Sequence, residues 1–389
     1  MASTDGTIAT AASLMASFAE RTGLTSDRPG ERYLWTDAFA VCNLLALAGP
    51  TGDERYTGLA LRLVDRVHGV LGRHRPDDSR AGWISGLSER EGELHPTRGG
   101  LRIGKRLPER RRDEPFDERL EWERDGQYFH YLTKWMHALD QVARATRDPR
   151  FNTWARELAE VAHTSFSYRP RAAARPRMVW KMSTDLSRPL VSSMGQHDPL
   201  DGFITCIQLE ATASQLSASA VGPSLKRAEA EFAAMFETSD LRTSDPLGLG
   251  GLLSDACRLA QLVEREACPR TDLPERLLAA ALDGLRHYAR LGDTRQPASR
   301  RLGFRELGLA IGISSLERLE RTERAELRAL LAALAPYSEL GSEIQSFWLD
   351  PENRRSETWA QHRDINEVML ATSLVPDGYV LLWSEGTRP

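Results

Sequence analysis

The sequence predicts an all-α protein, an (α/α)6 toroid of about six helical hairpins with long loops near one mouth. Three observations lead to this fold class. Apolar residues recur with the helical period through most of the 389-residue chain. Helices with a charged face alternate with helices almost free of charge, and a helix that is apolar on most sides must be surrounded by protein. No sequence repeat of fixed length is present, so a closed ring of hairpins fits better than an open solenoid.

The expected elements follow from these patterns in chain order. The segment 53–72, DERYTGLALRLVDRVHGVLG, gathers its leucines and valines on one stripe and charges on the other, as do four further segments (150–166, 222–237, 273–291 and 321–335). Five segments are nearly charge-free in their bodies and are expected inside (32–48, 198–218, 246–265, 303–317 and 364–375). Helices are also expected over 8–22 and 125–147. The only β-like run is YVLLW at 379–383.

We expect one domain over residues 1–389, because no linker rich in Pro, Gly or Ser divides the chain. Two connections, 76–124 and 168–197, are much longer than ordinary turns, and such loops are usually functional or disordered. The second contains Trp180 and Met182, which favour burial, so we expect it to be ordered and to cover one mouth of the barrel.

Composition excludes several classes of protein. A net charge of −4 argues against a nucleic-acid partner, and the lack of a long apolar stretch argues against a membrane span. The N-terminal segment does not resemble a signal peptide, so we expect a cytoplasmic, bacterial-type protein. Four scattered cysteines do not make a disulfide framework, and Cys42, Cys206 and Cys257 are expected to be buried free thiols, with Cys268 outside these patterns.

The approaches to the charge-free helices are rich in acids, glycines, histidines and aromatic residues. In a ring of antiparallel hairpins the inner helices run parallel, so their N-termini meet at one mouth and bring partial positive charge to it. Such a mouth suits polyhydroxylated or anionic ligands. The competing interpretation is that each aspartate there is only a helix N-cap. This applies to Asp37, Asp125, Asp198, Asp245 and Asp364.

The strongest cluster is MGQHDPLDG at 194–202. Pro199 fits the first position of a helix with Asp198 as its cap, which leaves Gln196, His197 and Asp201 unexplained by capping. A histidine between two carboxylates is a candidate acid/base group. We expect no metal there, because no second histidine follows at helical spacing.

Two further clusters carry candidates. In the first, DGQYFHYLTKW at 125–135, Tyr128, Tyr131 and Trp135 share one helical face and suit either a carbohydrate-sized cavity or the core. In the second, at 359–367, Asp364 and Glu367 also fit a capping box. The remaining candidates are Trp35, Asp37, Lys181, Arg305 and Glu306.

The motifs WTDAF, DGQYFHYLTKW and HDPLDG at helix entrances, together with the helix alternation, resemble the six-hairpin glycosidase-like class of (α/α)6 barrels. That class includes glycoside hydrolases, unsaturated glucuronyl hydrolases and the N-acylglucosamine 2-epimerase group. The resemblance therefore implies a carbohydrate-active enzyme. A related branch, resembling lanthionine cyclases, carries zinc on Cys and His, but its motifs are absent here.

The favoured hypothesis is a glycoside hydrolase in which Asp125 and Asp201 are the catalytic carboxylates and His197 assists them, with Asp37 or Asp364 as substitutes. Mutating Asp125 or Asp201 to Asn is expected to leave the fold intact. No cofactor is expected, the ligand is a small molecule or an oligosaccharide, and the oligomeric state is open. The substrate-binding candidates are Trp35, Asp37, Tyr128, His130, Lys181, Gln196, Asp198, Arg305, Glu306, Trp359, His362 and Asp364.

Two alternatives remain. One is a sugar epimerase or isomerase that uses His197 with His130 or His362 as bases. It would be favoured by two imidazoles facing one cavity without a nearby carboxylate pair. The other is a non-catalytic protein that keeps the barrel for ligand binding or as a scaffold, in which every carboxylate at the mouth is a satisfied cap.

Overall fold

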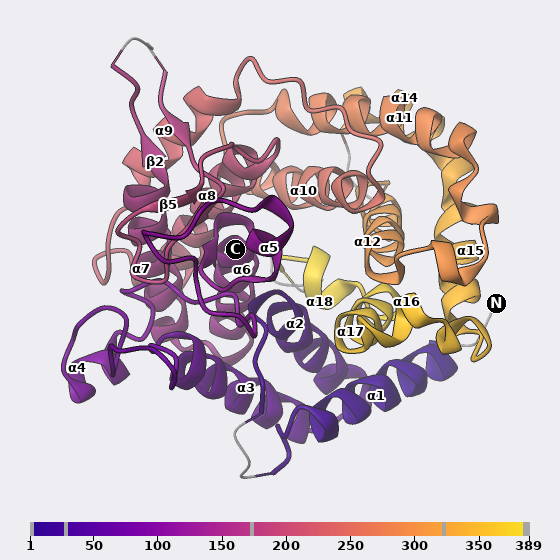
Figure 1. Ribbon diagram of the computed structural model, residues 1–389. Helices are drawn as coiled ribbons and strands as arrows, with labels where there is room; N and C mark the ends of the chain where they lie inside the picture. Colours follow the sequence, from indigo (N-terminus) through magenta and orange to yellow (C-terminus); the bar gives the residue numbers. More distant parts are fainter. Residues whose placement is uncertain (1–3, 27–29, 172–174, 321–323, 384–389) are drawn as a thin grey trace. The chain divides into compact units, whose positions relative to one another are not determined.

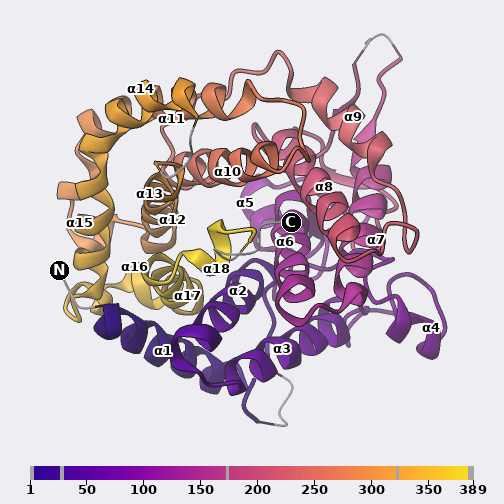
Figure 2. The same ribbon diagram turned by 180° about the vertical axis from the view of Figure 1, so that it is seen from behind.

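The computed structural model describes residues 4–26, 30–171, 175–320 and 324–383, and helices dominate it (Figures 1 and 2). Two compact units are present. Unit 1 comprises residues 1–19, 42–56 and 240–389, and unit 2 comprises residues 20–41 and 57–239. Three helices contribute residues to both units: α1 (Thr4–Arg21), α2 (Leu34–Thr51) and α3 (Arg55–Leu71).

Unit 2 is built around two long helices that pack together, α6 (Phe129–Thr146) and α8 (Asp198–Gln215). Helix α7 (Pro149–Phe166) packs on α6, and helix α9 (Lys226–Phe236) packs on α8. A buried polar network joins three of these helices, because Asp140 of α6 accepts hydrogen bonds from Asn152 of α7 and from Gln208 and Thr212 of α8.

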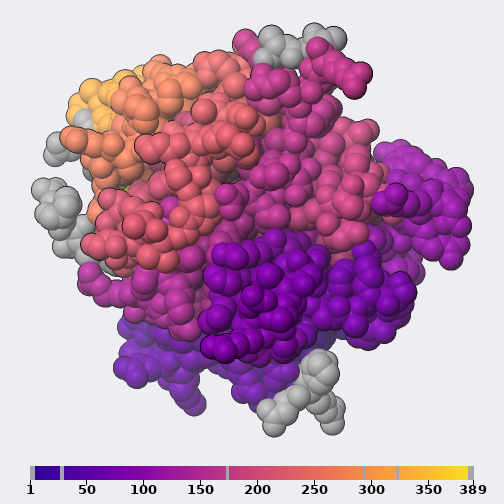
Figure 3. Space-filling model, turned by 90° about the vertical axis from the view of Figure 1, so that its left-hand side faces the viewer, coloured from indigo at the N-terminus to yellow at the C-terminus, as the bar shows by residue number. Residues whose placement is uncertain are grey.

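The long connections of unit 2 carry its short elements. Segment 76–124 contains α4 (Glu89–Leu94) and α5 (Glu118–Glu123), and its purple atoms form a broad part of the surface seen in Figure 3. Strands β1 (Gln127–Tyr128), β4 (Lys181–Met182) and β5 (Pro189–Val191) form an antiparallel sheet in the order β1-β4-β5. A second antiparallel pair joins β2 (Ser167–Tyr168) to β3 (Arg177–Met178).

Unit 1 repeats the pattern of an inner and an outer helix. Its inner helices α10 (Pro246–Glu264), α12 (Gly303–Ser314) and α17 (Arg363–Leu374) are mostly buried, and α12 packs against both α10 and α17. Along their outer side lie α11 (Leu273–Leu291), α14 (Ala325–Leu334) and α15 (Ser338–Leu349) (Figure 1). The short helices are α13 (Leu316–Leu319), α16 (Glu357–Ala360) and α18 (Asp377–Val380), with 3-10 turns at Asp293–Arg295, Ala298–Arg300, Ala335–Tyr337 and Asn353–Arg355.

The all-α class is confirmed, and each of the twelve expected helical segments contains a helix. The part of segment 321–335 at 321–323 lies outside the described residues. The expected β-run at 379–383 is wrong, because Tyr379 and Val380 end α18 after the turn-forming Pro376. Helix α15 was not predicted, because the first half of its segment is rich in Ser, Gly and Glu.

The burial predictions can be compared with the structure directly. Cys42, Cys206 and Cys257 are buried free thiols as expected, and Cys268 is buried as well. In segment 168–197, Met182 is buried as expected, whereas Trp180 is only half-buried. Residues 172–174 of this segment lie outside the described residues. No helix within the described ranges is long and apolar enough to cross a membrane.

Candidate active site

Three segments of unit 2 that lie far apart in the sequence bring the main candidates together. The start of α2 carries Trp35, the start of α6 carries His130, and the start of α8 carries Asp201. Antiparallel pairing of β1 with β4 sets Tyr128 opposite Lys181, which places segment 168–197 beside the start of α6. Since α6 also packs on α8, the first turns of both helices contribute to one site.

Asp201 is a buried carboxylate with two donors from α6. Lys134 Nζ donates to Asp201 Oδ2 at 2.8 Å, and the Thr133 hydroxyl donates to the same oxygen. Thr133 also donates to the carbonyl of His130. Charge-assisted hydrogen bonds of this kind are strong and directional, so the pair fixes Asp201 and compensates its charge.

Asp198 lies one turn earlier on the same helix, in a different environment. It is 7% exposed, and its Oδ2 has no hydrogen-bond partner within the described part of the chain. Burial, and next the charge of Asp201, raise the pKa of Asp198 to about 7. A carboxyl group of this kind holds its proton up to neutral pH, which is what a general acid requires.

The predicted cap at Asp198 is wrong, and the local backbone explains why. The helix begins at Asp198 itself, His197 occupies the N-cap position, and no side chain caps the helix. The Asp198 carboxylate lies against Gly195, where a Cβ would collide with both of its oxygens. Glycine at 195 therefore leaves room for the carboxylate. Gln196, between them, is exposed.

His130 stands at the start of α6 in a neutral form. Trp180 Nε1 donates to His130 Nδ1 at 3.2 Å, which places the imidazole proton on Nε2. Burial, helped by the charge of Lys134, lowers the pKa of His130 to about 3, although Asp201 opposes this shift. The ring therefore stays uncharged at neutral pH.

Aromatic side chains surround His130. The Tyr33 and Tyr131 hydroxyls are 2.6 Å apart and share a hydrogen bond, and the Tyr131 ring lies 5.3 Å from the rings of both Trp35 and Tyr128. Trp35 is buried, and its Nε1 has no partner among the described residues. Aromatic groups with polar tips are suited to a ligand that has both apolar faces and hydroxyl groups.

The lysines are concentrated in this part of the molecule. The chain contains only four, Lys105, Lys134, Lys181 and Lys226. The Lys105 ammonium lies 5.5 Å from the centre of the Tyr33 ring, Lys134 binds Asp201, and Lys181 pairs with the buried Glu121. Lys226, at the start of α9, is exposed. Three of the four lysines therefore belong to the site or its supports.

Asp125, predicted to be the second catalytic carboxylate, is completely buried in an ion-pair cluster. Arg102 Nη1 donates to its Oδ2 at 2.6 Å, the backbone N–H groups of Gly104 and Lys105 donate to its Oδ1, and Arg75 lies 3.6 Å away. The predicted N-cap at Asp125 is wrong, since α6 begins at Phe129. This geometry is that of a carboxylate that anchors segment 76–124 to the start of α6.

Two other predicted ligand-binding residues of unit 2 have structural partners. Lys181 is fully buried and donates to the carbonyls of Glu121 and Arg124 as well as to the Glu121 carboxylate. Asp37 accepts from the Tyr33 N–H at 3.1 Å and pairs with the buried Arg32 at 3.4 Å.

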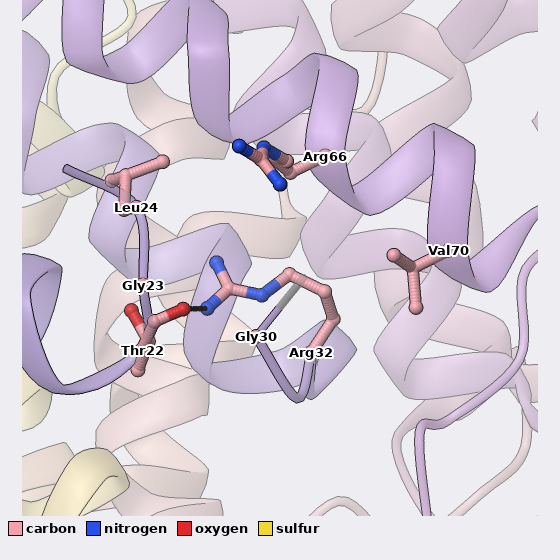
Figure 4. Close-up of a pocket in the computed structure, with 7 residues that line it drawn as sticks. All are labelled: Thr22, Gly23, Leu24, Gly30, Arg32, Arg66 and Val70. Carbon is pink, nitrogen blue, oxygen red and sulfur yellow. Dashed lines mark hydrogen bonds between the residues drawn. The ribbon is translucent and has the colours of Figure 1, made fainter. Parts of the chain in front are cut away.

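Arg32 also lines a small pocket, which Figure 4 shows together with its hydrogen bond to the Thr22 carbonyl. The other residues that line it are Thr22, Gly23, Leu24, Gly30, Arg66 and Val70. None of the predicted site residues lines this pocket, although Arg32 pairs with the candidate Asp37. We therefore do not assign the pocket to the candidate site.

The candidates of unit 1 form structural contacts of their own. Arg301 binds the buried Glu306 with both its Nε and its Nη2, and Trp348 Nε1 donates to Glu306 as well. Arg305 pairs with Asp245 at 2.6 Å. The predicted cap at Asp245 is confirmed, because its side chain accepts from the Gly248 N–H.

The last cluster of candidates is at the start of α17 in unit 1. Trp359 is buried against Trp348, with ring centres 5.1 Å apart. His362 and Asp364 are exposed. The predicted capping box of Asp364 with Glu367 is wrong, because His362 occupies the N-cap position and Glu367 pairs with Arg363 instead.

Two contributors to the unit 2 site, Thr133 and Trp180, were not among the predicted site residues, because neither forms a recognisable motif of its own. Asp198 was predicted as a cap or a substrate contact and not as a catalytic carboxyl group. The available signal was the spacing of Asp198 and Asp201, because acids three apart share one face of a helix. Among the residues that the structure describes, no group of three or more His, Cys, Asp or Glu side chains is arranged to hold a metal ion.

No protein-family model matches this chain, and no curated protein sequence matches it. Two solved structures are similar to it. A GH76 α-mannanase from Bacteroides thetaiotaomicron is 8% identical, with 94% of this chain and 96% of that chain covered and a TM-score of 0.54. A cellobiose 2-epimerase from Spirochaeta thermophila DSM 6192 is 13% identical, with 95% and 98% covered and a TM-score of 0.48.

The similarity to the mannanase concerns the fold, since identity is too low to transfer an activity. It confirms the predicted fold class, an all-α fold of the (α/α)6 toroid type.

Proposed function

We propose that this protein is a glycoside hydrolase in which Asp198 is the proton donor and Asp201 the second carboxylate. One observation carries the proposal: a buried carboxyl oxygen on Asp198 that has no hydrogen-bond partner among the described residues, one helical turn from a carboxylate held by Lys134 and Thr133. Glycoside cleavage needs one protonated and one ionised carboxyl group, and enzymes obtain them by giving two carboxyls different environments.

The chemistry assigned to the pair is proton transfer followed by capture of water. Asp198 donates its proton to the oxygen of the leaving sugar as the bond from that oxygen to the anomeric carbon breaks. Asp201 stabilises the positive charge that develops on the sugar ring. A water molecule then adds to the anomeric carbon and loses a proton, which restores Asp198.

This pair keeps Asp201 from the sequence hypothesis and replaces Asp125 with Asp198. Asp125 already receives its hydrogen bonds from Arg102 and two backbone N–H groups. Asp198 combines burial with an oxygen that has no partner among the described residues. His197 and Gln196, which directly precede Asp198, remain candidates for contacts with the substrate.

Sugar recognition is assigned to the aromatic group around His130. Tyr131 and Trp35 offer ring faces to the apolar C–H surface of a sugar, while the His130 Nε2–H and the tyrosine hydroxyls suit its hydroxyl groups. The oligosaccharide expected from the sequence fits this set of side chains.

The epimerase alternative requires a histidine base. The Nδ1 lone pair of His130 already accepts the Trp180 N–H, which leaves Nε2 as a donor. A carboxylate pair is also next to it, which is the arrangement that favours hydrolysis over epimerisation. We therefore prefer the hydrolase.

The test is a search for hydrolysis with purified protein. α-Mannosides come first because the fold is similar to that of an α-mannanase, followed by β-mannosides, glucosides, galactosides and xylosides. Nuclear magnetic resonance of the products distinguishes hydrolysis from epimerisation. We expect Asp198→Asn and Asp201→Asn each to lower kcat by about 10²–10⁴-fold.

The matched control is Asp240→Asn, which changes an exposed aspartate that pairs with the neighbouring Arg242 and should leave the rate unchanged. Full activity in Asp198→Asn, or epimerised sugar as the only product, would exclude the proposal.

A further inference from the structure

An exposed tryptophan stands next to the candidate site. Trp122, on α5, is 45% exposed and packs edge-to-face on Trp180, with ring centres 4.8 Å apart and an interplanar angle of 79°. Trp180 in turn stacks on His130 at 5.9 Å and 21°, and donates to it. The three rings therefore form a continuous row from the protein surface to the site.

The helix that carries Trp122 is held by buried charges. Its six residues are too few to be stable alone. Lys181 Nζ, fully buried, donates to the Glu121 carbonyl at 2.6 Å, to the Arg124 carbonyl at 2.8 Å and to the Glu121 carboxylate at 2.9 Å. Arg110 Nε donates to the other Glu121 oxygen at 3.0 Å.

Burying a lysine and a glutamate next to Trp122 costs desolvation energy that an apolar pair would not. The result is an indole held rigidly while almost half of its surface faces solvent. Rigid aromatic side chains bind ligands with a small loss of conformational entropy.

The surroundings of Trp122 fit a sugar better than a protein. Glu118 and Arg119, at helical positions next to Trp122, are exposed and charged. Leu120 is two positions away and projects from a different side of the helix, so it does not extend the indole into one broad apolar face. Phe116, just before the helix, is 57% exposed, and its ring lies 5.7 Å from the Arg110 guanidinium. A single ring face with a polar border matches a pyranose, whose C–H face is apolar and whose edge carries hydroxyl groups.

We propose that Trp122 and Trp180 form an additional sugar-binding subsite, so that the ligand is an oligosaccharide with one ring stacked on Trp122 beyond the rings held around His130. This inference rests on the proposed function for its ligand class. The inference adds that the number of sugar units in the ligand is recognised at a position that takes no part in the chemistry.

The experiment measures binding by calorimetry with the full-length protein. The probes are manno-, gluco-, galacto- and xylo-oligosaccharides from the disaccharide to the hexasaccharide, titrated into the wild type and into Trp122→Ala, Trp122→Phe and Tyr168→Ala. Tyr168 is the matched control, an aromatic residue on β2 that is 44% exposed. Thermal unfolding of each variant checks that it is folded.

We expect affinity for one series to rise with length in the wild type. Trp122→Ala should lower the affinity for the longer oligosaccharides of that series by about tenfold and leave the affinity for the disaccharide unchanged. Trp122→Phe should keep most of the increase in affinity with length. Equal affinity of wild type and Trp122→Ala at every length would overturn the subsite, as would a wild-type dimer that Trp122→Ala dissociates without any effect of sugar.

Failure of the proposed function gives a different result. If binding depends on oligosaccharide length and on Trp122 but no probe is hydrolysed, the subsite is supported and the proposed hydrolase function is excluded. Hydrolysis that depends on Asp198, with no effect of Trp122 at any length, does the reverse.

Discussion

At the scale of single residues, three buried aspartates of unit 2 show how surroundings decide what a carboxyl group can do. Asp125 receives donors on both oxygens, and Asp201 receives an ammonium and a hydroxyl on one oxygen. Asp198 has an oxygen that meets no donor within the described ranges. The same side chain is therefore an anchor in one place and a candidate acid in another.

The rate of the proposed reaction should depend on the protonation of Asp198. Its pKa is raised to about 7, so the acid form is present below that pH and is lost above it. We expect kcat to fall about tenfold per pH unit on the alkaline side. A pH–rate profile checks this, and a rate that stays level through pH 9 (roughly two units above the pKa) would contradict it.

Asp125 should matter for stability. Removing one partner of a buried ion pair leaves an uncompensated charge, so Asp125→Asn is expected to lower the free energy of unfolding by about 3–5 kcal/mol. This departs from the sequence hypothesis, which expected the fold to be unaffected. Urea titration measures the change, with the exposed Asp240→Asn as the control. If Asp125→Asn leaves the stability unchanged but abolishes activity, Asp125 is a catalytic residue, as the sequence hypothesis stated.

At the scale of elements, α10 and α12 approach so closely that their backbones touch. A Cβ at Gly250 would collide with the Gly308 carbonyl, and a Cβ at Gly312 would meet the backbone of Gly250. Glycine is required there by the lack of space and not by an unusual dihedral angle. The close contact explains why these two mostly buried helices carry so many glycines despite the cost of glycine in a helix.

Gly250→Ala is expected to separate these helices and to destabilise unit 1 by about 1–3 kcal/mol. Gly251, the next residue, has open space where a Cβ would be, so Gly251→Ala is the matched control and should be neutral or slightly stabilising. Thermal unfolding compares the two, and equal melting temperatures would contradict the packing argument.

The helices could be predicted because their periodicity is strong, and the exceptions have physical causes. In α15, Leu340, Ile344 and Trp348 follow helical spacing, but the first half of the segment, Ser-Glu-Leu-Gly-Ser-Glu, consists mainly of residues that also favour turns and caps. The run Tyr379–Trp383 is apolar enough for a strand, yet its first residues end a short helix and pack in the core. Short apolar runs do not distinguish helix from strand.

At the scale of the whole molecule, Asp198 links folding to pH. Between about pH 4 and about pH 7 the folded protein keeps a proton on Asp198 that the unfolded chain has lost, because burial raises the pKa of Asp198 in the folded state from its ordinary value of 3.8 to about 7. The contribution of Asp198 to stability therefore falls as pH rises through this window, by about 4 kcal/mol in total.

Comparing urea unfolding of the wild type and Asp198→Asn at both ends of this window isolates the effect. We expect the wild type to lose stability relative to the variant as the pH rises. A constant difference between the two proteins would show that Asp198 titrates normally in the folded state.

The location of the site was only partly predictable. The sequence indicated the starts of α6 and α8, since HDPLDG and DGQYFHY combine acids and aromatics before buried helices. It did not reveal that Arg102, many residues before Asp125 in the chain, takes up that carboxylate, or that Trp180 binds His130. Both contacts join segments that no local pattern connects, so they depend on the tertiary structure.

The uneven distribution of lysine makes the protein a convenient subject for chemical labelling. Lys181 is fully buried and Lys226 is exposed, whereas Lys105 and Lys134 are half-buried beside the candidate site. An amine-reactive reagent at low excess should therefore modify Lys226 first among the lysines. Mass spectrometry of the slower reaction at Lys105 and Lys134 would then report, without any knowledge of the reaction product, whether an added compound occupies that region.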